Sequence, residues 1–212
     1  MKTDDLIRAL AAAAPEKRPS MDLAMLAALV AAFAVSGVLF AMILGPRPDI
    51  GQAVETPRFL FKFVATLTLA VTAAAVVMRL ARPAAPPGRT AALLWIGPAL
   101  LAMAVAAELL VVPREQWMPR LVGNAAMVCF ASIPVLAAPI LAGALWALRN
   151  GAPTRPRLAG AAAGLLAGGL GATLYAAHCM DDSPLFLMAW YVPAVALVAA
   201  AGALAGARLL RW

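Results

Sequence analysis

Six long apolar segments, separated by short polar connections, dominate the pattern of hydrophobic and polar positions along the chain. They cover residues 23–44, 58–80, 91–112, 121–148, 158–179 and 185–207. A helix needs about 20 mostly apolar residues to cross the hydrocarbon core of a bilayer. Glycine, proline or charged residues bound each segment, as is typical of helix ends. The pattern therefore predicts an all-α fold, a polytopic bundle of six transmembrane helices in which successive helices are antiparallel.

The composition agrees with a membrane protein and excludes an ordinary soluble fold. Of the 212 residues, 64% are hydrophobic and 13% are charged, whereas a soluble domain carries about 25% charged residues. The only polar segment of note is at the start of the chain. We therefore expect two parts, a head of residues 1–22 and a transmembrane domain of residues 23–212.

Basic residues are distributed unevenly between the two ends of the predicted bundle. Of the 17 Lys and Arg residues, 12 lie in the head, the second and fourth connections and the tail, and 5 lie on the other side. The positive-inside rule therefore predicts that both termini are cytoplasmic. Because the basic residues flank apolar segments, we expect them to meet anionic lipid headgroups of the bilayer, and we expect no direct binding of nucleic acid.

The head predicts a short amphipathic helix over residues 1–14. Asp4 and Asp5 fall in its first turn, where the helix dipole favours anions. One apolar stripe is formed by Leu6, Ile7 and Leu10. Two interpretations stay open: a helix or tail at the inner leaflet, or a helix that docks into a groove of a cytosolic partner. The acidic start favours a protein partner, because interfacial helices are usually rich in Lys and Arg.

The two cysteines of the chain occupy matching positions in the fourth and fifth apolar segments. Cys129 and Cys179 lie at nearly equal distances from the connection 149–157, roughly 30 Å from the cytoplasmic end. A single cysteine in a membrane helix is often only a small apolar residue. Two at one depth on neighbouring helices, facing an oxidising compartment, favour a functional thiol pair. Pro134 and Pro139 are predicted to bend the fourth helix below Cys129.

Polar residues next to Cys179 suggest a metal, although weakly. His178, Asp181 and Asp182 are possible accessory ligands of a soft or borderline divalent ion. His178 and Cys179 are adjacent, however, and point about 100° apart on a helix. The Asp181–Asp182 pair equally fits a turn before the sixth helix. We expect no resident cofactor, and transient heavy-metal ligation stays open.

Two ionisable residues fall inside apolar segments, Lys62 in the second and Glu108 in the third. Such residues often mark transport paths. Both are near the predicted outer interface, so we expect their side chains to reach out to the polar headgroup region. Because no catalytic motif is present, the chain is not predicted to be an enzyme.

Small residues recur at spacings of three or four positions in the last two apolar segments. The glycines concerned are Gly160, Gly164, Gly168, Gly171, Gly202 and Gly206. Such faces allow helix backbones to approach closely in membranes. The spacing therefore predicts close helix packing along both segments.

Four stretches of the chain resemble the NrsF family, bacterial negative regulators of a sigma factor of the sigma-F type. They are residues 1–10, 149–156, 178–186 and 208–212. The resemblance covers essentially the full length and implies an inner-membrane anti-sigma factor that holds an extracytoplasmic-function sigma factor at the cytoplasmic face. It also implies release under metal or oxidative stress, and the family's two cysteines correspond to Cys129 and Cys179. One departure is the run of four alanines after Leu10, which ends the polar surface of the head early.

The resemblance and the residue pattern together predict a mechanism. The head and the connections 79–89 and 149–157 cover the polymerase-binding surface of the sigma factor. Oxidation or metal ligation of the thiol pair repacks the fourth and fifth helices and weakens that contact. The alternative is a small inner-membrane thiol oxidoreductase or metal permease. It is less favoured, because the chain has no Cys-x-x-Cys motif and its predicted midplane is apolar.

Overall fold

The computed structural model of the chain describes residues 3–12, 21–82, 88–151 and 153–210. Over these residues the secondary structure is helical, without strands, which confirms the predicted all-α class. The six predicted spans are confirmed as helices long and apolar enough to cross a membrane. They are Asp22–Ile43, Pro57–Leu80, Gly88–Val111, Ala126–Leu148, Pro156–Ala176 and Pro184–Leu209.

The spans are built from these elements: α2 (Met21–Ile43), α4 (Pro57–Leu80), η1 (Gly88–Trp95) followed by α5 (Ile96–Val111), α7 (Ala126–Arg149), α8 (Pro156–Ala176), and the succession α9 (Pro184–Phe186), η3 (Leu187–Tyr191) and α10 (Val192–Leu209). Short helices occupy two connections: α3 (Ile50–Ala53), η2 (Arg114–Gln116) and α6 (Trp117–Val122). The predicted head helix is present as α1 (Thr3–Ala12), while residues 1–2 and 13–20, which include the predicted charged link of residues 16–20, lie outside the described part.

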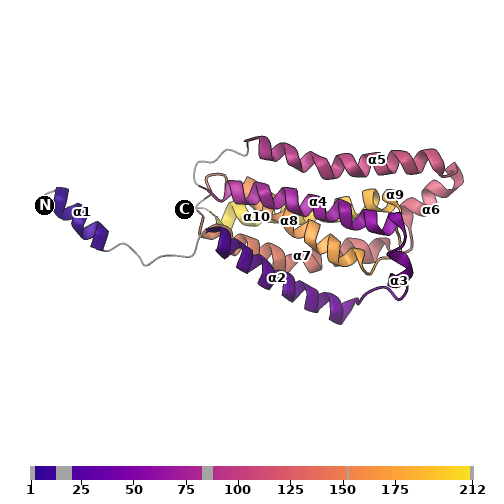
Figure 1. Ribbon diagram of the computed structural model, residues 1–212, viewed down its shortest axis with the longest axis horizontal. Helices are drawn as coiled ribbons and strands as arrows, with labels where there is room; N and C mark the ends of the chain where they lie inside the picture. Colours follow the sequence, from indigo (N-terminus) through magenta and orange to yellow (C-terminus); the bar gives the residue numbers. More distant parts are fainter. Residues whose placement is uncertain (1–2, 13–20, 83–87, 152, 211–212) are drawn as a thin grey trace.

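The bundle has two distinct ends. In Figure 1, α3, α6 and α9 gather at one end, which we call the distal end. The C-terminal end of α10 lies at the other, proximal end, and α1 is drawn apart from the bundle on that side (Figure 1). The described chain therefore starts its first span and ends its last span at the same end of the bundle.

The fourth predicted span begins later than expected, because a glycine interrupts the helix. The prediction of residues 121–148 is wrong at its start: α6 ends at Val122, and α7 begins at Ala126. Gly123 between them has φ +60, and a Cβ there would lie 2.5 Å from the Phe186 ring. Only glycine fits this position. Downstream, Pro134 and Pro139 lie inside the continuous helix α7.

Helix α8 is the central helix of the bundle, and glycine lets its neighbours approach it. In the apolar stretch of its span, 67% of the residues are buried inside the bundle, against 6% in the span Asp22–Ile43. A Cβ at Gly164 would lie 2.6 Å from the Ala199 backbone of α10, and one at Gly202 would overlap the carbonyl oxygen of Gly160. The prediction of close packing along the glycine faces is confirmed for α8 against α10.

We expect Gly202→Ala to lower the free energy of unfolding by about 1–3 kcal/mol, because the added methyl forces α8 and α10 apart. Gly37→Ala is the matched control, since a Cβ at Gly37 of α2 meets nothing within 4 Å. The stability of both variants is measured on purified protein in detergent, by titration with dodecyl sulfate and monitoring of unfolding by circular dichroism. Equal stability of the two variants would contradict the close approach.

Candidate functional site

The loop of residues 177–183, which we call the distal loop, connects α8 to α9 and is held by residues from far along the chain. The Arg47 backbone N–H donates to the Ala177 carbonyl at 3.0 Å. The Lys62 ammonium donates to the Cys179 carbonyl at 2.8 Å, and the Arg47 guanidinium donates to the same oxygen at 3.2 Å. Two cations, one from α4 and one from the connection after α2, therefore fix the backbone at Cys179.

The same two cations neutralise one carboxylate of the distal loop. Lys62 Nζ lies 2.5 Å from Asp182 Oδ1, and Arg47 Nη1 lies 3.0 Å from both Asp182 oxygens. The Lys62 side chain is fully buried although it lies only about 8 Å along α4 from Pro57. A buried charge is tolerated only when it is paired and hydrogen-bonded. Asp182 is therefore what allows Lys62 to be buried.

Arg47 also pairs with a second carboxylate, Asp49, which lies in the same connection after α2. Arg47 Nε and Nη2 each lie 2.7 Å from an oxygen of Asp49. Hydrogen bonds to Asp49 and then Asp182 raise the pKa of the Arg47 guanidinium, against the opposing effect of burial. In return, Arg47 lowers the pKa of the Asp49 carboxyl. The pair of Arg47 and Asp49 therefore keeps both charges at neutral pH.

Glu108 of α5 forms another buried polar contact, with the last residue of the distal loop and the start of α9. Its carboxylate is 3% exposed and accepts hydrogen bonds from the Ser183 hydroxyl at 2.6 Å and the Arg120 guanidinium at 2.9 Å. Leu185 N–H donates to it at 3.3 Å. The expectation that Lys62 and Glu108 extend to the headgroup region is wrong. Both are buried, because partners at the distal end satisfy them.

The two cysteines lie together at the distal end. Cys129, in the first turn of α7, and Cys179, in the distal loop, belong to one cluster of contacting buried side chains and are 0% and 1% exposed. Both are free thiols. The fifth apolar segment was expected to be helical to Cys179, but α8 ends at Ala176. The predicted pair is therefore buried at the distal end of the bundle, with Cys179 in the distal loop itself and not in a helix.

The surroundings of Cys179 disfavour its thiolate form in this conformation. Burial raises the pKa of the Cys179 thiol, and this is partly offset by the nearby Lys62 ammonium and by backbone hydrogen bonding at Asp181. The thiol itself faces the Asp181 carbonyl oxygen, 3.7 Å from the sulfur. Because the thiolate is the nucleophile and the metal ligand, the sulfur must gain solvent or hydrogen-bond donors before it reacts.

Two tyrosines border the thiols, and the sequence pattern does not mark either of them as part of a functional site. Tyr175 and Tyr191 belong to the same buried cluster as Cys129 and Cys179, with ring centroids 5.8 Å apart. Both hydroxyl oxygens are buried without a hydrogen-bond partner. Leaving such a group unsatisfied costs about 1–3 kcal/mol. We call Cys129, Cys179, Tyr175 and Tyr191 the thiol cluster.

The three possible accessory metal ligands each have a partner within the protein. His178 Nδ1 lies 3.0 Å from the Gly45 carbonyl oxygen. Asp181 accepts the N–H groups of Asn124 and Ala125 at 3.0 Å and so caps α7. Asp182 pairs with Lys62 and Arg47. Among the residues that the structure describes, no three His, Cys, Asp or Glu side chains are grouped to hold a metal ion, and metal ligation here stays a prediction.

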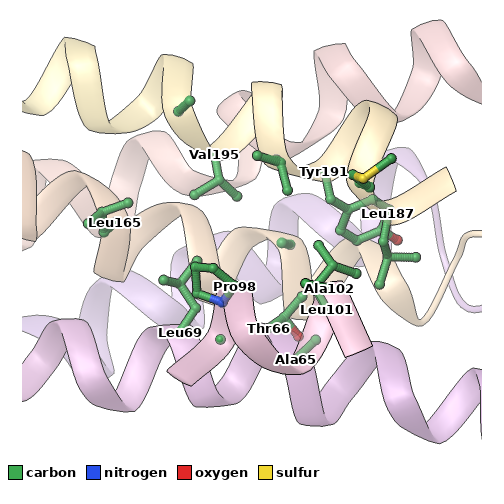
Figure 2. A pocket seen from close by; sticks show the side chains of 15 residues that line it. Ala65, Thr66, Leu69, Pro98, Leu101, Ala102, Leu165, Leu187, Tyr191 and Val195 are labelled. Atoms are coloured by element: carbon green, nitrogen blue, oxygen red, sulfur yellow. The ribbon is translucent and has the colours of Figure 1, made fainter. Parts of the chain in front are cut away.

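An apolar cavity lies beside the thiol cluster, at the depth of the membrane spans. It has a volume of about 370 Å³ and is bounded by residues of α4, α5, α8 and the η3–α10 segment. Figure 2 shows Leu69, Pro98, Leu101 and Val195 around it, with Tyr191 at one side. The lining suits hydrocarbon and not a polar substrate, and Tyr191 is common to the cavity wall and the thiol cluster.

The head is described only in part. In α1, Asp4 and Asp5 are exposed, and Ile7 is 58% exposed. The side chains of Leu6 and Leu10, the rest of the predicted stripe, lie outside the described side chains. The predicted acidic first turn is present, and Ile7 is free to meet a partner.

Fold and site together define a multi-pass helical membrane protein with a sealed thiol pair at one end. The chain belongs to the NrsF family: the sequence profile described as "Negative regulator of sigma F" matches residues 10–212. It is 42% identical to "Anti-sigma-F factor NrsF" of Caulobacter vibrioides (strain NA1000 / CB15N), over 100% of both chains. It is 37% identical to "Probable anti-sigma-F factor NrsF" of Azospira oryzae (strain ATCC BAA-33 / DSM 13638 / PS), again over 100% of both. No solved structure matches the chain.

We expect Asp182→Asn to lower the free energy of unfolding by about 3 kcal/mol, because it leaves Lys62 buried without a carboxylate. This loss is at the low end of the range for breaking a buried ion pair, since the Asp182 side chain is 20% exposed. Detergent-solubilised protein titrated with dodecyl sulfate gives the measurement.

Two comparisons make this test specific. Asp22→Asn removes an exposed carboxylate 3.8 Å from Arg82 and is expected to cost less than about 1 kcal/mol. Adding Lys62→Met to Asp182→Asn is expected to restore part of the loss. If Asp22→Asn and Asp182→Asn cost the same, the buried pair does not hold the distal loop.

Proposed function

We propose that the protein is an anti-sigma factor of the bacterial inner membrane, which binds an extracytoplasmic-function sigma factor at the cytoplasmic face. The observation that carries the proposal is the match of residues 10–212 to a family described as negative regulators of sigma F. The relatives named as anti-sigma-F factors match over their whole length, so the head is included in the similarity. Binding at the membrane keeps the sigma factor from RNA polymerase.

The distribution of charge supports a cytoplasmic proximal end. Of the five basic residues on the distal side, Arg47, Arg58, Lys62 and Arg120 have carboxylate partners within the protein. The bias of the sequence, 12 basic residues against 5, favours the proximal side as cytoplasmic. On this orientation α1 lies in the cytosol, where its exposed Asp4, Asp5 and Ile7 are available to the sigma factor.

We further propose that the thiol cluster senses the inducing stress. A two-electron oxidant such as a peroxide joins the sulfurs of Cys129 and Cys179, which releases two protons and passes two electrons to the oxidant. A soft divalent metal instead replaces both thiol protons and forms two metal–sulfur bonds. Both reactions need access to buried sulfurs, and so both need the distal loop to open.

The helices that carry the thiols also reach the cytoplasmic side. Cys129 lies near the start of α7, and Cys179 follows α8; the other ends of these helices meet at the connection 149–157. Closely packed helices shift as bodies and do not deform locally. A new bond between the sulfurs, or to a shared metal, therefore moves this connection and weakens the contact with the sigma factor.

The head is tested by replacing its apolar stripe. The triple change Leu6→Asp, Ile7→Asp, Leu10→Asp is expected to lower the affinity for the sigma factor at least tenfold, because apolar anchors dominate helix-in-groove binding. Arg8→Ala, on the same helix but outside the stripe, is the control and keeps binding. Co-purification from detergent extracts and titration with the purified sigma factor give the affinities.

The same extracts test the proposal as a whole. Retention of the sigma factor by the triple variant at the unchanged affinity contradicts docking through α1. Transport of metal or turnover of thiols by the unaltered protein, with no sigma factor bound, supports the oxidoreductase or permease alternative instead.

The sensor is tested by removing the sulfurs. Cys129→Ser with Cys179→Ser is expected to keep the sigma factor bound and to abolish its release, because serine neither forms a disulfide nor binds soft metals well. Transcription from a sigma-dependent promoter, in cells treated with cadmium or peroxide, is the readout. Met180→Leu is the control, since it removes an oxidisable sulfur that is 59% exposed beside Cys179. Normal induction in the double cysteine variant would falsify the sensor.

A further inference from the structure

A buried thiol that reacts must develop negative charge in an apolar setting. Metal ligation and attack on an electrophile both proceed through the sulfur anion. An anion without hydrogen-bond donors is strongly disfavoured inside a protein. The Cys179 carbonyl already takes the donors of Lys62 and Arg47, so the charge that develops on the sulfur needs donors of its own.

Two unused donors lie in the same cluster. Tyr175 and Cys179 are four residues apart, and the Cys179 N–H donates to the Tyr175 carbonyl at 3.0 Å, so both residues are on one face of the chain where α8 ends. The Tyr191 ring packs against that of Tyr175, 5.8 Å between centroids. Both hydroxyl oxygens are buried without a hydrogen-bond partner, in a cluster of otherwise mostly apolar side chains.

The backbone places Tyr191 in an unusual position. It ends the π-helical turn Leu187–Tyr191, which lies between α9 and α10. Such turns are rare and are frequent at functional sites, because the extra residue redirects the side chains that follow. An irregular turn and two unsatisfied phenols therefore meet at the two thiols of the chain.

We propose that Tyr175 and Tyr191 are positioning residues of the thiol cluster, whose hydroxyls donate hydrogen bonds to the cysteine sulfur as it becomes an anion. The proposal rests on the function proposed above for the cysteines, and adds the groups that make a buried pair able to react. It also gives a reason for the two buried hydroxyls without a partner: they would gain an acceptor once the cysteine sulfur is an anion.

Other charged groups around Cys179 have different tasks. Lys62 and Arg47 bind its carbonyl oxygen and Asp182, while Asp181 caps α7. His178 faces the Gly45 carbonyl. The phenols are therefore the donors in the described cluster that have no other acceptor.

The test measures the reactivity of one thiol. In the full-length protein carrying Cys129→Ser, N-ethylmaleimide reacts with Cys179 alone: the sulfur anion adds to the carbon–carbon double bond, and the neighbouring carbon takes up a proton. We expect Tyr175→Phe and Tyr191→Phe each to slow this reaction roughly tenfold at one fixed pH, the size expected for one hydrogen bond to a charged group. Ser36→Ala is the matched control, because it removes a buried unpartnered hydroxyl outside the cluster.

A second measurement separates positioning from structure. In protein with both cysteines, cadmium alone is added, and infrared difference spectra are recorded. We expect a tyrosine O–H stretch to move to lower frequency, to be lost in the Phe variants, and the cadmium dissociation constant to rise roughly tenfold. The unfolding midpoint of the Phe variants is expected to equal or exceed that of the unaltered protein, because each loses an unsatisfied group.

The outcomes are distinct. Alkylation rates of both Phe variants within twofold of Ser36→Ala, with no tyrosine band shift, overturn the proposal. Faster alkylation also overturns it, and this is the result if Phe merely loosens the fold and exposes the thiol. Because no sigma factor is present, these results are separate from the release assay. If the cysteine variants lose release of the sigma factor while the Phe variants react with N-ethylmaleimide at the normal rate, the proposed sensor is supported and the proposed role of the tyrosines is overturned.

Discussion

The burial of the Lys62 ammonium is the constraint on which the distal half of the structure depends. A lone cation inside an apolar bundle costs several kcal/mol even after relaxation. Here Asp182 and the Cys179 carbonyl offset this cost, and Cys179 is 117 positions further along the chain than Lys62. The Phe59 ring of α4 also lies near the ammonium, 5.2 Å from centroid to Nζ, but the oxygen partners both come from the distal loop, so the ion pair forms only when that loop is closed over the end of α4. Arg47 then adds a third attachment, between the connection after α2 and the same carboxylate.

Closure of the loop has a direct effect on the thiols. The residue whose carbonyl is bound by Lys62 and Arg47 is Cys179 itself, and Asp181 beside it caps the helix that carries Cys129. One short loop therefore fixes both sulfurs in depth and seals them from solvent. The sensing function proposed for the thiols requires two states, closed with buried thiols and open with reachable ones, whose free-energy difference would be set largely by the ion pair. On that proposal, stability of the resting state and sensitivity to stress are opposed through the same contact.

Much of the fold could be predicted from the sequence because it depends on local pattern. The apolar segments, their boundaries at proline and glycine, and the glycine faces of α8 and α10 all reflect composition within a few turns of helix. The matched depth of the two cysteines followed from counting residues along two antiparallel helices. The start of the fourth span could not be obtained in this way, since the contacts that require a glycine at the break, Phe186 and Asp181 against Gly123, come from far along the chain.

The chemistry of the site was less predictable, because its partners are far apart in the chain. A lysine near the end of an apolar segment looks the same whether it extends to the headgroups or turns inward to a carboxylate. The difference lies in Asp182, which local pattern assigns equally well to a turn. Likewise, nothing nearby in sequence marks Tyr175 and Tyr191; their signal is the absence of acceptors for two buried hydroxyls, a property only of the packed structure. Because unsatisfied groups are disfavoured in an apolar interior, finding both beside the two thiols makes the cysteine cluster, and not the ion pair alone, the place where this protein departs from a purely structural bundle.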